Sequence, residues 1–416
     1  MKLQHYILAF AIASSMQLTD FKLGLVKVGD LFSVVLIFYY FLNIGRKHFY
    51  KPYIQLFKLF VFYFISSIIV MIWVKIYLPS SDLSILRQPG WISISRLIQL
   101  LGCVCFGLII HDILVTNSKR FNDKFLKQID QFVFLFFCFF ILMYVLSFIG
   151  VDSPFVYGGG RLRGGYVEGG PFGLFVVFYF IVRNFLFGRN LKWLVLVIIL
   201  IAATQSKASV LFFIVALILQ QLYKQKISIP KVIGTLSVLL LFTVIINSYF
   251  DFVDRIEGYI SDYNEIELQI AKRPDDANLI MGRIAATVIA PKMIEDNFLL
   301  GVGLGNYSLT RNNPNYLGVL PSVKEWDLTG LGGITNLLIE TGVIGIFLFF
   351  RILYILYRKT KYKVLKYLIL IFIIVQFFGV QTYFQYIWYL FGIITAIFYC
   401  KERYLEEPLT MNLTIK

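Results

Sequence analysis

Residues 131–150 read QFVFLFFCFFILMYVLSFIG and contain no charged side chain. A helix rises about 1.5 Å per residue, so a run of this length reaches about 30 Å, the thickness of the hydrocarbon core of a bilayer. Inside lipid every backbone N–H and C=O must be bonded within the protein, and only helices or closed barrels achieve this. The run therefore predicts a membrane-spanning helix.

The same pattern recurs along the chain, which is 58% hydrophobic and only 15% charged, with a mean hydropathy of +0.76. Soluble domains are about 45–50% apolar and about 25% charged. We predict an all-α, polytopic membrane helix bundle of about 12 transmembrane helices. The predicted spans are residues 3–18, 25–43, 57–77, 94–114, 131–150, 171–187, 191–205, 207–223, 231–248, 332–355, 364–381 and 383–400.

Basic residues orient this bundle. Lys and Arg collect in alternate loops, with clusters at 46–58, 119–127, 183–192, 224–231 and 351–366. The positive-inside rule assigns these loops to the cytoplasm, so we predict an even number of spans with both termini cytoplasmic. Residues 401–416 then form a cytoplasmic tail. The net charge of +15 follows from this topology and from attraction to anionic lipid, and calls for no nucleic acid.

One long polar segment, residues 248–330, interrupts the apolar pattern. We predict nine spans within residues 1–247, with a short outer loop at 151–170. A large extracytoplasmic loop follows at 248–330, and three spans lie within 331–400. All four cysteines lie within predicted spans and all three histidines in the cytoplasmic half, so we expect no disulfide framework and no metal site outside. The first apolar segment lacks a signal-peptide cleavage site and predicts a retained helix.

The short outer loop is rich in glycine and carries two arginines. It includes Gly-Gly-Gly-Arg161-Leu-Arg163-Gly-Gly-Tyr166-Val-Glu168-Gly-Gly-Pro171. Each guanidinium presents a planar fork of donors that suits phosphate oxygens, and glycine amides can line the same anion. The loop therefore predicts a diphosphate cradle. The alternative is a flexible turn whose arginines reach lipid head groups.

The large loop shows two further patterns. A helix is predicted to start near Asp276, with Arg283 on its solvent face and Pro291 breaking or kinking it. The spaced glycines Gly301, Gly303 and Gly305 do not follow a buried strand, so they favour a tight reversal against the membrane face over a nucleotide loop.

Asn336 and Glu340 lie four residues apart and share a helix face just inside the predicted outer boundary. An acidic residue at that depth is either functional or paired, and both interpretations of Glu340 stay open.

At these residues the chain resembles the O-antigen polymerase (Wzy) and O-antigen ligase family of bacterial envelope proteins. Three stretches carry the resemblance: Arg163-Gly-Gly-Tyr-Val-Glu-Gly-Gly-Pro-Phe-Gly, Arg283 together with Asn297 to Tyr307, and Asn336-Leu-Leu-Ile-Glu-Thr-Gly-Val-Ile-Gly. Many spans with one long outer loop before the last three also resemble this family.

The resemblance implies a polymerase, a metal-independent glycosyltransferase without a cofactor, in the bacterial cytoplasmic (inner) membrane. It would join undecaprenyl-diphosphate-linked oligosaccharide repeat units into O-antigen or a similar polysaccharide, with a chain-length regulator as a candidate partner. Arg161, Arg163 and Arg283 would bind diphosphate, and Glu168 or Glu340 would accept a proton. Residues expected to contact sugar are Tyr157, Tyr166, Asn306, Tyr307 and Asn336, with Trp326 as a further stacking face.

Two alternatives remain. Ligases of the family usually carry a histidine at the end of the long loop, where this chain has Thr329-Gly-Leu-Gly-Gly333, and this favours a polymerase over a ligase. A flippase or transporter for the same lipid-linked sugars fits the number of spans. Such proteins usually contain two related halves, and no repeat relates residues 1–205 to 206–416.

Overall fold

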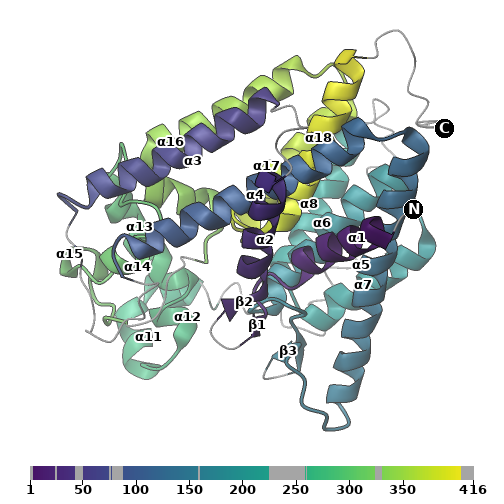
Figure 1. Cartoon of the computed structure of the whole chain (residues 1–416). Helices are drawn as coiled ribbons and strands as arrows, with labels where there is room; N and C mark the ends of the chain where they lie inside the picture. Colours follow the sequence, from purple (N-terminus) through teal and green to yellow (C-terminus); the bar gives the residue numbers. More distant parts are fainter. Residues whose placement is uncertain are drawn as a thin grey trace.

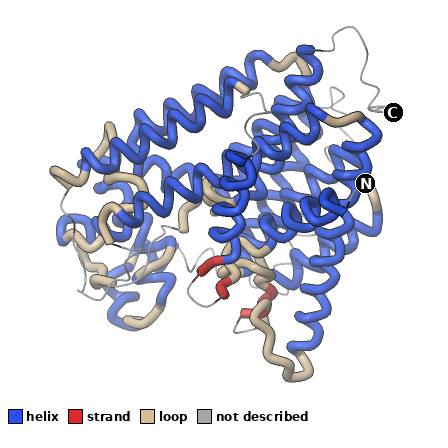
Figure 2. Tube along the Cα trace, viewed as in Figure 1, coloured by secondary structure: helices blue, strands red, loops and turns tan. Residues whose placement is uncertain are grey.

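The computed structural model describes residues 3–23, 26–42, 50–74, 76, 88–157, 160–223, 258, 260–323 and 330–403 of the 416-residue chain. This part of the chain is mostly helical, which confirms the predicted class. Figure 2 shows strands only in two short hairpins beside the helices. The strands are β1 (Lys22–Leu23), β2 (Val26–Lys27), β3 (Val156–Tyr157) and β4 (Arg161–Leu162), paired antiparallel as β1–β2 and β3–β4.

Apolar helices occupy the predicted spans that the structure describes. The first eight are α1 (Leu3–Gln17), α2 (Val28–Leu42), α3 (Lys51–Val70), α4 (Trp91–Thr116), α5 (Lys119–Ser147), α6 (Gly169–Phe187), α7 (Leu191–Thr204) and α8 (Lys207–Tyr223). The last are α16 (Gly333–Lys359), α17 (Lys363–Ile374), the 3-10 helix η3 (Val375–Phe378) and α18 (Gln385–Arg403).

Length and composition make five of the described helices (α3, α4, α5, α6 and α16) able to cross a membrane. α7, α8 and α18 are apolar but shorter. The count of about 12 spans stays a prediction, since the predicted span 231–248 lies outside the described residues.

The core of the bundle is built around α4 and α18, which pack against each other (Figure 1). Trp388 of α18 is fully buried and donates its indole N–H to Thr382 O at 2.8 Å. α5 lies at the periphery and leaves large apolar side chains such as Leu135 and Leu142 exposed. In water this face would be unfavourable, and lipid is the solvent that suits it.

A second, smaller core lies in the polar segment. It is formed by α11 (Ile266–Lys272), α12 (Ala277–Ile280), α13 (Arg283–Asp296), α14 (Tyr307–Thr310) and α15 (Pro314–Leu317). Figure 1 shows these helices gathered beside one end of α3 and α16. Buried apolar residues of α13 and α15 pack against Ile339 of α16, so the segment is joined to the bundle rather than free of it.

The helix predicted from Asp276 is two helices, because the chain breaks at Met281–Gly282 between α12 and α13. Pro291 lies inside α13 and does not end it. The break places Arg283 at the first residue of α13, where its side chain is exposed.

α16 is interrupted at Gly342, which has φ 63° and ψ −171°. Residues 298–306, called the inserted loop below, dock against this break. Val302 N donates to Ile339 O at 3.0 Å and Gly303 N to Glu340 O at 2.9 Å, while Val343 N donates back to Phe298 O at 2.9 Å. The loop backbone thus bonds groups that the broken helix leaves unpaired.

Close approach explains the glycines of the inserted loop. A Cβ on Gly301 would stand 2.5 Å from Glu340 C, and one on Gly305 would stand 3.0 Å from the Arg96 side chain. Both have positive φ, at 69° and 78°. These glycines permit packing between α4 and α16, so the predicted tight reversal has a specific partner.

Candidate functional site

The Arg/Gly loop, defined here as residues 160–170, brings two arginines to one end of α6. Arg161 lies opposite Tyr157 in the β3–β4 hairpin. Its Nε and Nη2 both approach Thr204 O at 3.4 Å, at the junction between α7 and α8. These long contacts satisfy only part of its donor capacity, so the fork can still bond an anion.

Arg163 holds the base of the same hairpin. Its Nε donates to Pro154 O at 2.9 Å, and its guanidinium carbon lies 5.8 Å from the centre of the exposed Tyr157 ring. Glu168 follows as the exposed N-cap residue of α6 and makes no capping bond with its side chain. Arg163, Tyr157 and Glu168 therefore lie on the accessible side of the loop.

The Arg/Gly loop is seated on the end of α1. Asp20 N donates to Gly165 O at 3.1 Å, and the Tyr166 hydroxyl donates to Met16 O. Tyr166 is 3% exposed, and its ring packs among Phe172, Phe175 and other aromatic residues. It offers no open face to a sugar in this structure and anchors the loop instead.

Arg283 approaches the same region from the polar segment. Its Nε donates to Gly330 O at 3.1 Å. Its Nη2 lies 3.9 Å from the position that a Cβ on Gly379 would take, and Leu174 Cδ1 of α6 lies 3.8 Å from that position. Arg283 therefore extends over the link between η3 and α18, beside the second turn of α6.

A chain of contacts joins the two arginine regions. Gly173, next to Leu174, leaves its Cβ position 2.9 Å from Thr204 Oγ1 and 3.1 Å from Ser206 Cβ. Thr204 O is the acceptor that Arg161 approaches. Arg161 and Arg283 thus each come close to residues that contact the first two turns of α6.

The link at residues 379–384, which Arg283 approaches at Gly379, carries several polar side chains. Asn336 Nδ2 of α16 donates to Gln381 Oε1 at 2.6 Å, and Thr382 Oγ1 donates to Gln376 Oε1 at 3.0 Å. Gly333 N donates to Val380 O at 2.9 Å, which fixes the start of α16 on the link. The predicted residue Asn336 is therefore buried against this link.

Three other predicted residues lie deeper. Glu340 is buried beneath the inserted loop, whose Gly303 N bonds its carbonyl. Asn306 and Tyr307 are each 1% exposed, and burial raises the pKa of Tyr307 to about 12. Neither offers an open face to a sugar in this structure. Trp326 lies outside the described residues.

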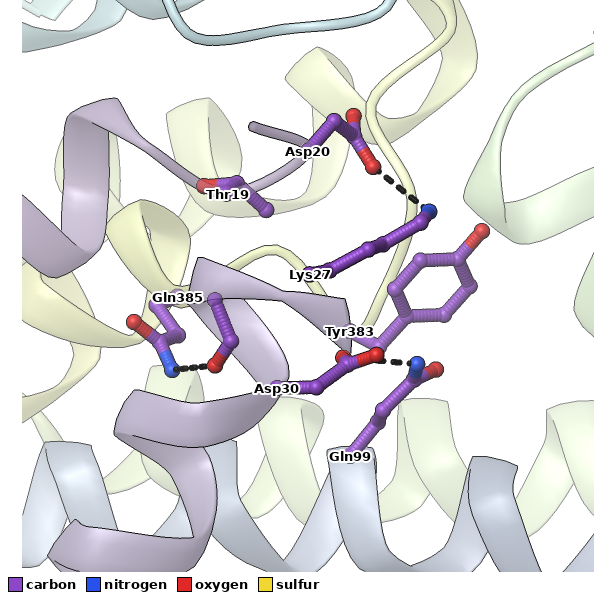
Figure 3. Close-up of a pocket in the computed structure, with 8 residues that line it drawn as sticks. Thr19, Asp20, Lys27, Asp30, Gln99, Tyr383 and Gln385 are labelled. Carbon is purple, nitrogen blue, oxygen red and sulfur yellow. Dashed lines mark hydrogen bonds and ion pairs between the residues drawn. The ribbon is translucent and has the colours of Figure 1, made fainter. Parts of the chain in front are cut away.

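Several polar residues beside the Arg/Gly loop were not predicted from the sequence. Asp20, Asp30, Gln99 and Tyr383 line a pocket beside the Arg/Gly loop (Figure 3). Asp30 and Gln99 lie within predicted spans, and Asp20 and Tyr383 at the edges of others, so each resembles an ordinary helix end. The available signal in the sequence was three glutamines (Gln376, Gln381 and Gln385) close to the junction between the predicted spans 364–381 and 383–400.

Metal ligands do not gather in this region. In the described ranges, no three His, Cys, Asp or Glu side chains lie close enough together to hold a metal ion.

Residues 193–350 match the family model Wzy_C, described as O-antigen ligase. The match runs from α7 into α16 and contains Arg283, the inserted loop and the break at Gly342, while the Arg/Gly loop lies before it. No curated protein matches the chain. Members of the matched family are glycosyltransferase-like enzymes that act on lipid-linked sugars, and five of the described helices are long and apolar enough to cross a membrane. Over residues 193–350, the match supports the resemblance to the O-antigen polymerase and ligase family that the motifs predict.

Proposed function

We propose that the protein is a polymerase that joins undecaprenyl-diphosphate-linked repeat units on the outer face of the cytoplasmic membrane. The observation that carries the proposal is that Arg161 and Arg283 each come close to residues that contact the first two turns of α6. Guanidinium forks on two segments near the same helix turns suit a diphosphate, whose oxygens accept paired hydrogen bonds.

The chemistry requires stabilisation of a leaving group. The bond between the anomeric carbon of the growing chain and the diphosphate oxygen breaks, and the diphosphate leaves with the electron pair. A hydroxyl oxygen of the acceptor sugar forms the new glycosidic bond and loses its proton. Fixed arginines (Arg161, Arg163 and Arg283) stabilise the charge that develops on the diphosphate. The proton passes to a carboxylate and then to water.

Two carboxylates are candidates for the proton acceptor. Glu168 is exposed next to the arginines, where an acceptor sugar has access. Glu340 is 9% exposed beneath the inserted loop, and reaching it would require that loop to move. Accessibility favours Glu168.

The ligase remains the second candidate function, because the matching family model carries that description. The polymerase is favoured because no histidine occurs anywhere in residues 248–330. A flippase is less favoured. Transporters use broken helices to line a substrate path, whereas the break in α16 is filled by backbone of the inserted loop.

The test is a gel of surface polysaccharide from cells that lack this gene and express variants. Arg163→Ala and Arg283→Ala should each abolish the polymer ladder and leave a lipid anchor capped with one repeat unit. Arg189→Ala is the matched control, because Arg189 is exposed between α6 and α7 at the opposite end of α6. Protein abundance in the membrane is measured for every variant.

Other outcomes separate the alternatives. Loss of even the single capped unit in cells lacking the gene would indicate ligation, with lipid-linked polymer accumulating on the outer leaflet, or flipping, with intermediates on the inner leaflet. A full ladder in both arginine variants would exclude these side chains from the mechanism. The expected chain-length regulator would be tested by crosslinking in the same cells.

A further inference from the structure

Two large apolar side chains are exposed at the start of the inserted loop. Phe298 is 54% exposed and Leu299 is 60% exposed, whereas residues 301–306 of the same loop are all buried. Both lie in the turn that follows α13, outside any helix. Adjacent apolar side chains of this size are unfavourable in water. The position of this turn relative to the bilayer therefore decides what covers them.

Backbone bonds hold the turn against the apolar part of α16. Val343 N donates to Phe298 O at 2.9 Å, and Ile344 N donates to Leu299 O at 3.2 Å. Ile344 is itself exposed, and so is Phe347, three residues further along the helix. Because residues three apart share a helix face, the exposed apolar surface continues from the turn onto α16.

The length of α16 gives the depth of this contact. α16 is long and apolar enough to cross a membrane, and its last turn carries Arg358 and Lys359, which suit a membrane surface. Residues 343–359 rise about 26 Å at about 1.5 Å per residue, and any tilt shortens the distance across the bilayer. The hydrocarbon core is about 30 Å thick, so the contact at Ile344 lies inside it. A surface marked by Arg351 instead would place the contact deeper still.

The end of α3 gives a second measure of depth. α3 packs alongside α16 (Figure 1). Trp73 lies just beyond α3 and is 56% exposed, and tryptophan is enriched where a membrane meets water. Ser67 lies about one turn inside the end of α3, and its hydroxyl accepts from Leu304 N at 2.5 Å. The part of the inserted loop that bonds Ser67 therefore lies deeper than Trp73.

The exposed side chains change in character at Asn297. Glu295 and Asp296, just before it, are exposed and charged. Phe298 and Leu299, just after it, are exposed and apolar. The backbone of the loop is bonded by α16, which is the condition for irregular backbone at membrane depth. This pattern is typical of a chain that passes from water into the upper part of a bilayer.

We propose that the inserted loop is a re-entrant segment, and that Phe298 and Leu299 bind the acyl chains of the leaflet next to the polar segment. The partner is bilayer lipid, which covers both side chains and holds the end of α13 at the membrane surface. This inference does not depend on the polymerase function, because it concerns only how the polar segment meets the membrane.

Fluorescence quenching by lipids tests this contact. The full-length protein, with its four cysteines replaced, carries Leu299→Cys labelled with an environment-sensitive dye, in phosphatidylcholine nanodiscs without lipid-linked sugars. We expect stronger quenching by a nitroxide near the top of the acyl chain than by a head-group nitroxide or by aqueous iodide. Leu268→Cys is the matched control, because Leu268 is 49% exposed in α11, next to Glu267. Its dye should be quenched mainly by iodide.

Two outcomes of this experiment would overturn the proposal. One is iodide quenching of the Leu299→Cys label that equals the quenching of the Leu268→Cys label. The other is shielding from iodide that appears only after lipid-linked repeat units are added, because the substrate tail, and not bilayer lipid, would then cover the turn.

A charge substitution gives a second measurement in the protein with its native cysteines. Leu299→Glu places a carboxylate among acyl chains, where a charge is unfavourable, so the melting temperature in nanodiscs should fall by several degrees. Leu268→Glu changes an exposed side chain in water and should leave the melting temperature close to that of the wild type. Equal melting temperatures of the two variants would contradict the membrane contact.

Discussion

Two glycine-rich segments of this protein look alike in sequence and do opposite things. In the Arg/Gly loop, glycines let a hairpin sit on the end of α1 while Arg161, Arg163 and Glu168 remain accessible. In the inserted loop, glycines let the backbone enter the break in α16, and residues 301–306 are all buried. One segment displays side chains, and the other removes them from solvent.

The difference shows that a high density of glycines indicates close approach of the backbone to its neighbours. It does not indicate whether the side chains of the segment are exposed or buried, which depends on the elements that pack against the segment. The inserted loop is covered by α3, α4 and α16, since Ser67 bonds Leu304 N and Ser93 bonds Leu304 O. The Arg/Gly loop is covered on one side only, so its polar side chains can meet a substrate.

The largest effect should come from Gly342→Ala. A Cβ there would collide with the backbone of Leu299, and φ of 63° disfavours any L side chain. We expect a loss of folding free energy on the order of 3 kcal/mol or more, measured as the melting temperature in detergent. Gly318→Ala is the control, with φ of 58° and nothing within 4 Å of the new Cβ. Its expected cost is about 1 kcal/mol; equal losses in the two variants would mean that the inserted loop does not fill the break.

The next largest effect, on polymer formation, concerns the Arg/Gly loop. Arg161→Ala should lower polymer formation on the order of 100-fold, the usual effect of removing one donor from a developing negative charge. The melting temperature should stay close to that of the wild type, because Arg161 makes only long contacts to Thr204 O. Arg161→Lys should restore little activity, since an ammonium cannot form the paired bonds of a guanidinium. Full activity in Arg161→Lys would show that charge alone suffices.

Gly165→Ala tests how the packing of the Arg/Gly loop against the end of α1 affects the protein. Its Cβ would collide with Gln17 O and stand 2.9 Å from Leu18 Cα. A hairpin at the surface can move away, so we expect a stability loss of about 2 kcal/mol or less and a clear fall in polymer length on the gel. Gly170→Ala should be neutral or slightly stabilising, because nothing lies within 4 Å of its Cβ and it is helical. An unchanged ladder in Gly165→Ala would mean that the position of this loop is unimportant.

The smallest effect concerns Tyr307, at the end of the inserted loop. Its buried hydroxyl has no hydrogen-bond partner, and burial raises its pKa to about 12. The folded state therefore holds this proton more tightly than the unfolded state, so stability is constant below about pH 10 and falls as pH rises through 12. Tyr307→Phe should be neutral or stabilising at pH 7 and gain about 1 kcal/mol more over the wild type at pH 11. Denaturant unfolding at both values measures this, and equal gains at pH 7 and pH 11 would contradict the burial of the hydroxyl.

Much of the fold follows from apolar run length. Predicted spans such as 3–18, 94–114 and 171–187 coincide with α1, α4 and α6. A single apolar run in lipid can bond all its backbone N–H and C=O groups only by forming a helix. The break at Gly342 was not predictable in this way. A glycine within an apolar run also permits close helix packing, as Gly345 does against Tyr63, whose hydroxyl bonds Gly345 O at 2.8 Å.

The site was predictable only in part. Arg161, Arg163 and Arg283 were predicted by residue type, and the structure brings Arg161 and Arg283 close to residues that contact the first two turns of α6. Sugar contacts were also predicted by residue type at Tyr166, Asn306 and Tyr307, yet the structure buries all three side chains. Residue type does not indicate which face of a loop packs against the bundle. Asp30 and Gln99 were missed because they meet only after α2 and α4 pack together.

The break in α16 also imposes an order on biosynthesis. The ribosome completes residues 298–306 before it makes α16, so the loop has no place to dock when it first emerges. Its bonds to Ile339 and Glu340 form only once the helix has been synthesised. Maturation of this protein therefore includes a late closing step, in which the inserted loop bonds the backbone on both sides of the break in α16.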